Sequence, residues 1–322
     1  MNVREVLETD AIPSIDDPSF GETYIGTDDD EVLVLDAEVP RAYPLRILNF
    51  HEIVNDSVDG DPVAVTWCPL CASAVVYERT VDGRVLTFGV SGKLADDDLV
   101  MYDRETDSEW KQSLGECIAG EFDGHELTVR PAGIITWETF TEQYPEGVVL
   151  QPTTMESEAA SDDNDPAPVD YLADPYEAYF ESEEFGLLAH REGEGRSWDR
   201  EDLHPKEVIL GIEHDGEAAG YPEERVRDAG GVVTDTVGGR DVVVFATSEG
   251  LHAFENPGHE FEVLASGDVR GGGTVWNPAT GESRDGRHLE RVPARGLFAF
   301  TWQDDHGRDA FSLGSSDCDE TE

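Results

Sequence analysis

The chain has 322 residues and a formal net charge of −50, because 72 aspartates and glutamates face only 22 lysines and arginines. This charge leaves no basic cluster to neutralise phosphates, which excludes nucleic acid and anionic membrane surfaces as partners. Hydrophobic residues still make up 38% of the chain and six tryptophans are present, which indicates folded cores and not a disordered acidic protein.

An acidic excess spread evenly along a chain is typical of proteins that stay hydrated in molar salt. At 1 M salt the Debye length is about 3 Å, so repulsion between these charges costs the fold little. We therefore predict a halophilic protein of the haloarchaeal type. The N-terminal sequence MNVREVLETDAIPSIDD lacks the apolar core of a signal peptide, and no apolar run is long enough for a membrane span. We expect a cytoplasmic protein.

The elements predicted along the first 150 residues are mainly strands. Strand patterns occur in VLVLDAEV (32–39), DPVAVTW (61–67), AVVYERTVDGRVLTFGVSG (74–92) and LVMYDRET (99–106). Asp82-Gly83 predicts a two-residue hairpin turn, since both residue types accept positive φ. Helices are expected over 44–56, after Pro44, and over 136–145, with Thr136 as the N-cap. A short helix is also expected in ASAVVY (72–77).

Four segments recur in the same order later in the chain, which predicts an internal duplication. Residues 31–44 match 207–222, and residues 53–65 match 232–244. Residues 101–108 match 275–282, and residues 123–131 match 285–293. The fold class predicted is α+β, rich in strands and built as two similar lobes. We expect a first lobe (1–150), an acidic linker or excursion (151–184), a second, degenerate lobe (185–305) and an acidic tail (306–322) that contains Cys318.

The strongest chemical motif is the Cys-x-x-Cys pair formed by Cys68 and Cys71. In the repeat alignment these residues fall on Thr247 and Gly250, so only the first lobe carries the pair. In a reducing compartment such a pair indicates metal binding or redox chemistry. For redox chemistry, the turn after the strand would direct backbone N–H groups at the first sulfur, lower its pKa and prepare it for disulfide exchange.

The alternative chemistry is a soft-metal site. Thiolates suit zinc or copper(I), and His51 is the third ligand that we predict. His51 could equally be a hydrogen-bonded core histidine. Weaker candidates for a pocket beside the site are Ser91, Met101, Asp103 and Trp110. A third interpretation is a non-catalytic ligand-binding or scaffold protein with buried structural cysteines, since free cysteine is among the most buried residue types.

Several longer motifs together carry a family resemblance. They are IPSIDDPSF (12–20), RAYPLRILNFHEIVND (41–56), PVAVTWCPLCASAVVYERTVDG (62–83), LTFGVSGKLADDDLVMYDRETDSEW (86–110) and GECIAGEFDGHEL (115–127). Their order resembles the domain of unknown function 3179 family. The resemblance implies that His51, Cys68, Cys71, Ser91, Asp103 and Trp110 occupy signature positions, and it implies no activity. Cys117 stands where this resemblance leads us to expect a small residue, so the third cysteine is interpreted as incidental.

The sequence thus predicts thiol–disulfide chemistry or soft-metal binding at Cys68 and Cys71, with zinc or copper as the cofactor in the second case. The partner is expected to be a small molecule, a metal ion or a redox protein. Whether the protein is an enzyme stays open at this point.

Overall fold

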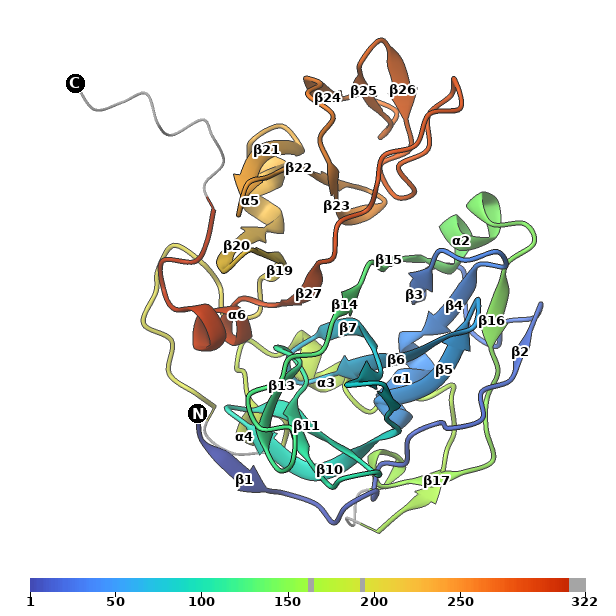
Figure 1. Ribbon diagram of the computed structural model, residues 1–322, viewed down its shortest axis with the longest axis vertical. Helices are drawn as coiled ribbons and strands as arrows, with labels where there is room; N and C mark the ends of the chain where they lie inside the picture. Colours follow the sequence, from blue (N-terminus) through green and yellow to red (C-terminus); the bar gives the residue numbers. More distant parts are fainter. Residues whose placement is uncertain (162–164, 192–194, 313–322) are drawn as a thin grey trace.

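The computed structural model describes residues 1–161, 165–191 and 195–312 (Figure 1). Strands account for 41% and helices for 13%, which confirms a β-rich α+β protein. The acidic residues 313–322, with Cys318, lie outside the described residues.

A seven-stranded antiparallel sheet runs through the centre of the molecule. Its strand order is β20 (Glu217–Pro222), β19 (Val208–His214), β27 (Arg295–Phe298), β7 (Ser73–Glu78), β6 (Asp61–Cys68) and β5 (Ile53–Val58), and β14 (Val129–Arg130) also pairs with β7. The strands of the two predicted lobes meet at the single pair Gly296–Ala74. The two halves therefore contribute to one continuous sheet.

Two five-stranded sheets flank this centre. One has the order β1 (Val3–Glu5), β10 (Phe88–Ala95), β11 (Asp98–Asp103), β12 (Glu109–Lys111) and β13 (Glu116–Ala119). The other has the order β15 (Gly133–Thr136), β3 (Glu31–Leu35), β4 (Arg41–Pro44), β16 (Val148–Leu150) and β2 (Phe20–Gly21). Smaller sheets are formed by β21 (Val232–Val237), β22 (Arg240–Thr247) and β23 (Gly250–Glu255), by β24 (Phe261–Val263), β25 (Val269–Gly271) and β26 (Thr274–Trp276), by β8 (Thr80–Val81) and β9 (Arg84–Val85), and by β17 (Glu156–Ser157) and β18 (Ala167–Pro168).

The helices are short. They are α1 (Leu45–His51), α2 (Trp137–Gln143), the 3₁₀ turn η1 (Glu158–Ala160), α3 (Glu177–Glu181), α4 (Leu187–His190), α5 (Glu223–Asp228) and α6 (Ala299–His306). Thr136 caps α2 as predicted, since its hydroxyl accepts the N–H of Thr139. The predicted turn at Asp82-Gly83 is also confirmed, with φ of 49° and 77° between β8 and β9.

One predicted helix is shorter than expected, and another is wrong. The helix expected over 44–56 ends at His51, because Glu52 has a φ of 57° and Ile53 then begins β5. The segment ASAVVY is not helical either, because Ser73 pairs with Cys68 and starts β7. Its β-branched valines occupy a central strand, where long-range pairing overrides the local pattern.

Alternate residues of β6 face two different cores, as the period of a strand requires. Val63, Val65 and Trp67 pack on the side of α1, whereas Ala64 and Cys68 pack on the side of β10 and β11. Cys68 therefore points into the space between the central sheet and the β10–β11 sheet.

The two halves show parallel local structure. Pro44 precedes α1 and Pro222 precedes α5 with nearly equal φ, −62° and −63°. The hydroxyl of Tyr43 donates to Asp56 at 2.6 Å, and that of Tyr221 donates to Asp235 at 3.1 Å. The halves differ at the hairpin that follows, where β6 and β7 are joined by four residues but β22 and β23 by two.

The segment expected to be a linker packs on the first half. Tyr179 of α3 is only 2% exposed, and its hydroxyl donates to the carbonyl of Leu70 at 2.7 Å. This contact places α3 over the cysteine hairpin.

Candidate functional site

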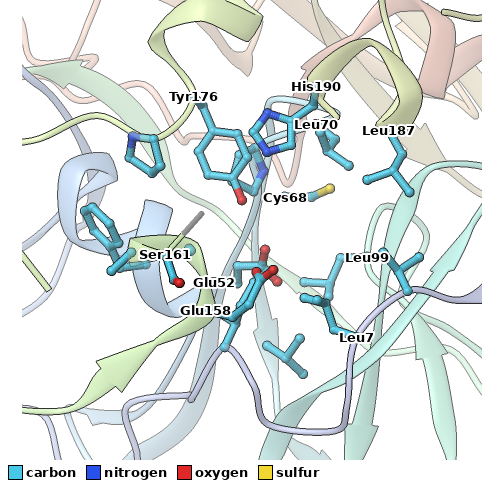
Figure 2. A pocket seen from close by; sticks show the side chains of 18 of the residues that line it. Leu7, Glu52, Cys68, Leu70, Leu99, Glu158, Ser161, Tyr176, Leu187 and His190 are labelled. Carbon is cyan, nitrogen blue, oxygen red and sulfur yellow. The ribbon is translucent and has the colours of Figure 1, made fainter. Parts of the chain in front are cut away.

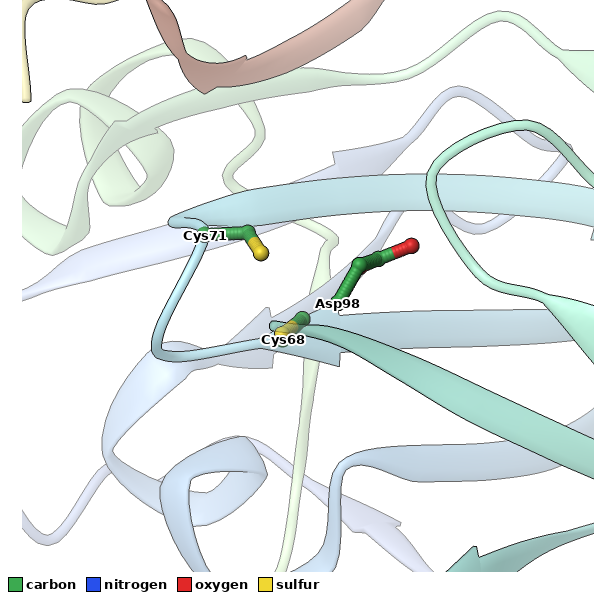
Figure 3. A group of neighbouring side chains, drawn as sticks. All are labelled: Cys68, Cys71 and Asp98. Atoms are coloured by element: carbon green, nitrogen blue, oxygen red, sulfur yellow. The ribbon is translucent and has the colours of Figure 1, made fainter. Parts of the chain in front are cut away.

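Cys68 and Cys71 stand at the two ends of one hairpin bend. Cys68 is the last residue of β6, and the loop Pro69–Ala72 returns the chain to β7. The N–H of Cys71 donates to the carbonyl of Cys68 at 3.2 Å, and Ala72 adopts a φ of 44° to complete the turn. The bend brings the two cysteines to 3.6 Å from each other (Figure 3).

Asp98, at the start of β11, joins this pair. The two sulfurs and one carboxylate oxygen lie within 4.8 Å of one another, and all three residues are buried (Figure 3). The Oδ2 atom of Asp98 accepts the N–H of Ser113 at 2.8 Å. Its Oδ1 atom has no hydrogen-bond partner among the described residues, although it is buried. A buried carboxylate oxygen without a partner is costly and indicates a missing donor or cation.

The electrostatic surroundings of the thiols are acidic. Burial raises the pKa of Cys68, where the nearby charges of Asp98 and Glu52 add to the effect, and it raises the pKa of Cys71 further. Burial also raises the pKa of Asp98 to about 6, against the opposing effect of Lys111. The thiols are therefore protonated at neutral pH, whereas a thiol poised for disulfide exchange has a lowered pKa.

Lys111 is a buried cation whose charge acts on Asp98. It is 2% exposed and forms an ion pair with Asp305 of α6. Burial opposes its charge, but Asp305 and Asp98 together raise the pKa of Lys111. Lys111 is already paired with Asp305, so its positive charge does not neutralise the group around the two sulfurs.

The structure places His51 away from the sulfurs. Its Nδ1 atom lies 2.9 Å from the carbonyl of Pro13, and its Nε2 atom lies 2.6 Å from the hydroxyl of Tyr171. The pattern is that of a neutral ring, and burial lowers the pKa of His51 accordingly. His51 is not part of the close group formed by Cys68, Cys71 and Asp98, whose geometry could hold a metal ion.

The four predicted pocket residues lie inside the β10–β12 sheet. Ser91 donates to the carbonyl of Val100 at 2.5 Å, and Met101 pairs with Val90 and Trp110 in the sheet core. The indole N–H of Trp110 donates to Asp103 at 3.0 Å. None of the four is among the described residues that line the large cavity beside Cys68. Cys117 donates to the carbonyl of Ala119 and stands outside the thiol pair.

The cavity of about 930 Å³ lies beside the hairpin (Figure 2). Cys68, Pro69 and Leu70 form part of its wall. The polar part of the wall includes four residues to which no sequence motif pointed, namely Glu52, Glu158, Tyr176 and His190. Three of these four lie in or after the segment expected to be a linker, which explains why no motif pointed to them. Glu52 directly follows His51, but the sequence pattern placed Glu52 inside the helix expected over 44–56 and gave no sign of a site there.

Glu52 has an unusual backbone and an unusual charge state. Its φ of 57° is rare for a residue other than glycine, and its side chain belongs to the cavity wall. Within the described part of the chain its carboxylate has no hydrogen-bond or ion-pair partner, and burial raises its pKa to about 8 with help from Glu158 and Asp98. Glu158, by contrast, faces Arg191 at 3.4 Å.

His190 and Tyr176 form the opposite polar wall. Their rings stack with centroids 4.8 Å apart. Burial lowers the pKa of His190, and the nearby charge of Arg191 lowers it further. The cavity wall thus contains the carboxyl groups of Glu52 and Glu158, a neutral imidazole, a phenol and one thiol, together with the charged side chains of Lys93, Asp170, Asp174 and Arg191.

Among the helices of the described ranges, none is long and apolar enough to cross a membrane. Comparisons with curated proteins and with solved structures give no match. The model of one family, described as proteins of unknown function (DUF3179), matches residues 9–309. This match covers nearly the whole chain, and the protein therefore belongs to the DUF3179 family.

Proposed function

We propose that the protein binds a soft metal ion, Zn²⁺ or Cu⁺, through Cys68, Cys71 and Asp98. The observation that carries this proposal is the buried group of two sulfurs and one carboxylate oxygen within 4.8 Å. The Oδ1 atom of Asp98, which lacks a partner among the described residues, supports it. Thiolate ligands favour zinc and copper(I) over harder ions.

Charge balance favours a metal over a reactive thiol. Thiolate forms of Cys68 and Cys71 would be repelled by the nearby carboxyl groups of Asp98 and Glu52, and Lys111 is already paired with Asp305. A bound cation would offset these charges and deprotonate the thiols, as metal ligation does elsewhere. Three protein ligands leave room for another ligand, and Cys68 borders the cavity from which such a ligand could come.

Reversible disulfide formation is the second candidate, and one observation favours it. Cys68 and Cys71 are 3.6 Å apart, so a modest rotation of the side chains would allow a sulfur–sulfur bond of about 2.0 Å. Their raised pKa values argue against rapid exchange at neutral pH.

We further infer that the chain arose by duplication and that only the first copy carries the thiol site. The matching tyrosine–aspartate bonds of the two halves support this inference. In the second half the equivalent hairpin is two residues shorter and contains no cysteine. The net charge of −50 supports the additional proposal of a halophilic, haloarchaeal-type protein that works in the cytoplasm.

Elemental mass spectrometry on protein purified anaerobically in concentrated KCl tests the metal site. We expect about one zinc or copper per chain, lost in Cys68→Ser and Cys71→Ser and bound more weakly in Asp98→Asn. Cys117→Ser is the matched control, since it removes another buried thiol and should leave the metal in place. Absence of metal after reconstitution, together with one reversible disulfide, would establish the redox function instead. Absence of both would leave the cysteines a structural role.

A further inference from the structure

We propose that the cavity beside Cys68 binds a small organic cation with an apolar body, and that Glu52 recognises its ammonium or guanidinium group. This inference goes beyond metal binding, since it rests on other residues and holds whether or not the thiols bind a metal.

The size and walls of the cavity fit a small molecule. A volume of about 930 Å³ lies in the range of ligand pockets. Leu7, Leu99 and Leu187 form an apolar wall, and Figure 2 shows them on one side, apart from the carboxyl groups. An inorganic ion would fill little of this space. A ligand with an apolar portion would cover the leucines while its polar end meets the opposite wall.

Glu52 is the polar group that calls for a partner. It is 7% exposed, lines the cavity and has no hydrogen-bond or ion-pair partner among the described residues. A buried carboxyl group of this kind is retained only where something offsets its desolvation. A ligand with an N–H donor and a positive charge would supply both the missing hydrogen bond and the missing charge.

The backbone at Glu52 adopts a conformation that costs free energy for a residue other than glycine. The residue follows the last turn of α1 with φ of 57° and ψ of −30°, a conformation in which glycine is the usual choice. Strained backbone at a non-glycine residue persists where the surroundings impose it, and such residues cluster in binding sites. A glycine at this position would relieve the strain but would remove the carboxyl group of Glu52 from the cavity.

The other charged groups of the wall leave the cavity negative. Both basic side chains of the described wall are already paired, since Arg191 faces Glu158 at 3.4 Å and Lys93 forms an ion pair with Glu109, which is not among the described lining residues. Asp170 and Asp174 add two further carboxylates. An anionic ligand would therefore be repelled. Tyr176 and His190 add two stacked rings to the cavity wall. Aromatic faces attract organic cations.

A panel matched in shape and different in charge tests the proposal. It consists of amines, alcohols and carboxylates that carry hexyl, phenethyl or indolylethyl bodies, titrated calorimetrically into the full chain at constant high salt. We expect at least one amine to bind. The dissociation constants of the matching alcohol and carboxylate should be higher by about tenfold or more, because each lacks one charge-assisted hydrogen bond. If no amine binds, or if alcohols or carboxylates bind equally well, the proposal is wrong.

Variants assign the binding to Glu52. Glu52→Gln keeps the volume and removes the charge, so amine binding should fall about tenfold while alcohol binding stays unchanged. Glu142→Gln, at an exposed position on α2, is the control and should bind like the unmodified chain. Unchanged amine affinity in Glu52→Gln would overturn the proposal. Cys71→Ser separates the two functions, because Cys71 is not among the described residues that line the cavity, so this variant should abolish metal binding and keep the preference for amines.

Discussion

The N–H of Phe298 donates to the carbonyl of Cys71 at 2.7 Å, so the loop that carries the thiols is bonded to a strand from the other half of the chain. This bond and the adjacent pair Gly296–Ala74 attach β27 to the hairpin. The thiol pair is therefore held from both halves, although only the first half supplies its sulfurs.

The carboxylate of Asp98 should contribute directly to metal affinity. Asp98→Asn keeps an oxygen and the shape of the side chain but removes the negative charge, so we expect the dissociation constant for Zn²⁺ to rise by about tenfold or more. Competition with a chromophoric chelator measures this change. Asp123→Asn, on an exposed turn, should leave affinity unchanged. Equal affinities for the two variants would remove Asp98 from the ligand set.

Glu52 should make stability depend on pH. Burial raises its pKa from 4.5 to about 8, so between these values the folded chain binds one proton more than the unfolded chain. The contribution of Glu52 to the free energy of unfolding consequently falls as pH rises, by up to about 1.4 kcal/mol per pH unit. Glu52→Gln cannot lose this proton, so denaturation at fixed salt should show its advantage growing from about pH 5 to pH 8. Parallel pH curves for both proteins would refute this assignment.

The ion pair between Lys111 and Asp305 should matter strongly for folding. Both side chains are 2% exposed, and they connect β12 to α6. Lys111→Met leaves Asp305 charged and buried, so we expect a loss of about 3–5 kcal/mol in the free energy of unfolding. The double variant Lys111→Met with Asp305→Leu should recover part of that loss, because no unpaired charge remains. Denaturant titration measures both, and a negligible effect of the single variant would contradict the burial of the pair.

The matching tyrosines of the two halves should have similar roles. Tyr43→Phe and Tyr221→Phe each remove a hydrogen bond to an aspartate, at 2.6 Å and 3.1 Å respectively. We expect each change to lower the free energy of unfolding by about 1–3 kcal/mol, with the larger effect at Tyr43 because its bond is shorter and its partner more buried. Chemical denaturation of both variants gives the comparison. A loss at one position alone would weaken the case for equivalent halves.

The local features of the fold could be predicted from the sequence. The turn at Asp82-Gly83 and the cap at Thr136 depend on neighbouring residues, and both are confirmed. The strand that ends at Cys68 was predicted for the same reason. The helix through Glu52 was not predicted correctly, because the positive φ that ends it comes from tertiary structure and not from a glycine or proline.

The composition of the site depended on contacts that no local pattern reveals. Asp98 reaches the sulfurs because β11 packs against the hairpin. This contact depends on how two separate sheets pack together. His51 was chosen for its nearness in the sequence, but its ring is turned toward Pro13 and Tyr171. Tyr176 and His190 arrive from a segment whose acidic, proline-bearing composition predicted a linker.

The bond between Phe298 and Cys71 also has a consequence for how the protein is made. Synthesis proceeds from the N-terminus, so the hairpin with both thiols leaves the ribosome long before β27 is translated. During that interval the carbonyl of Cys71 lacks its partner and the loop lacks its cover. The nascent chain therefore exposes its thiols to solvent first, and the site is completed only after β27 has been translated.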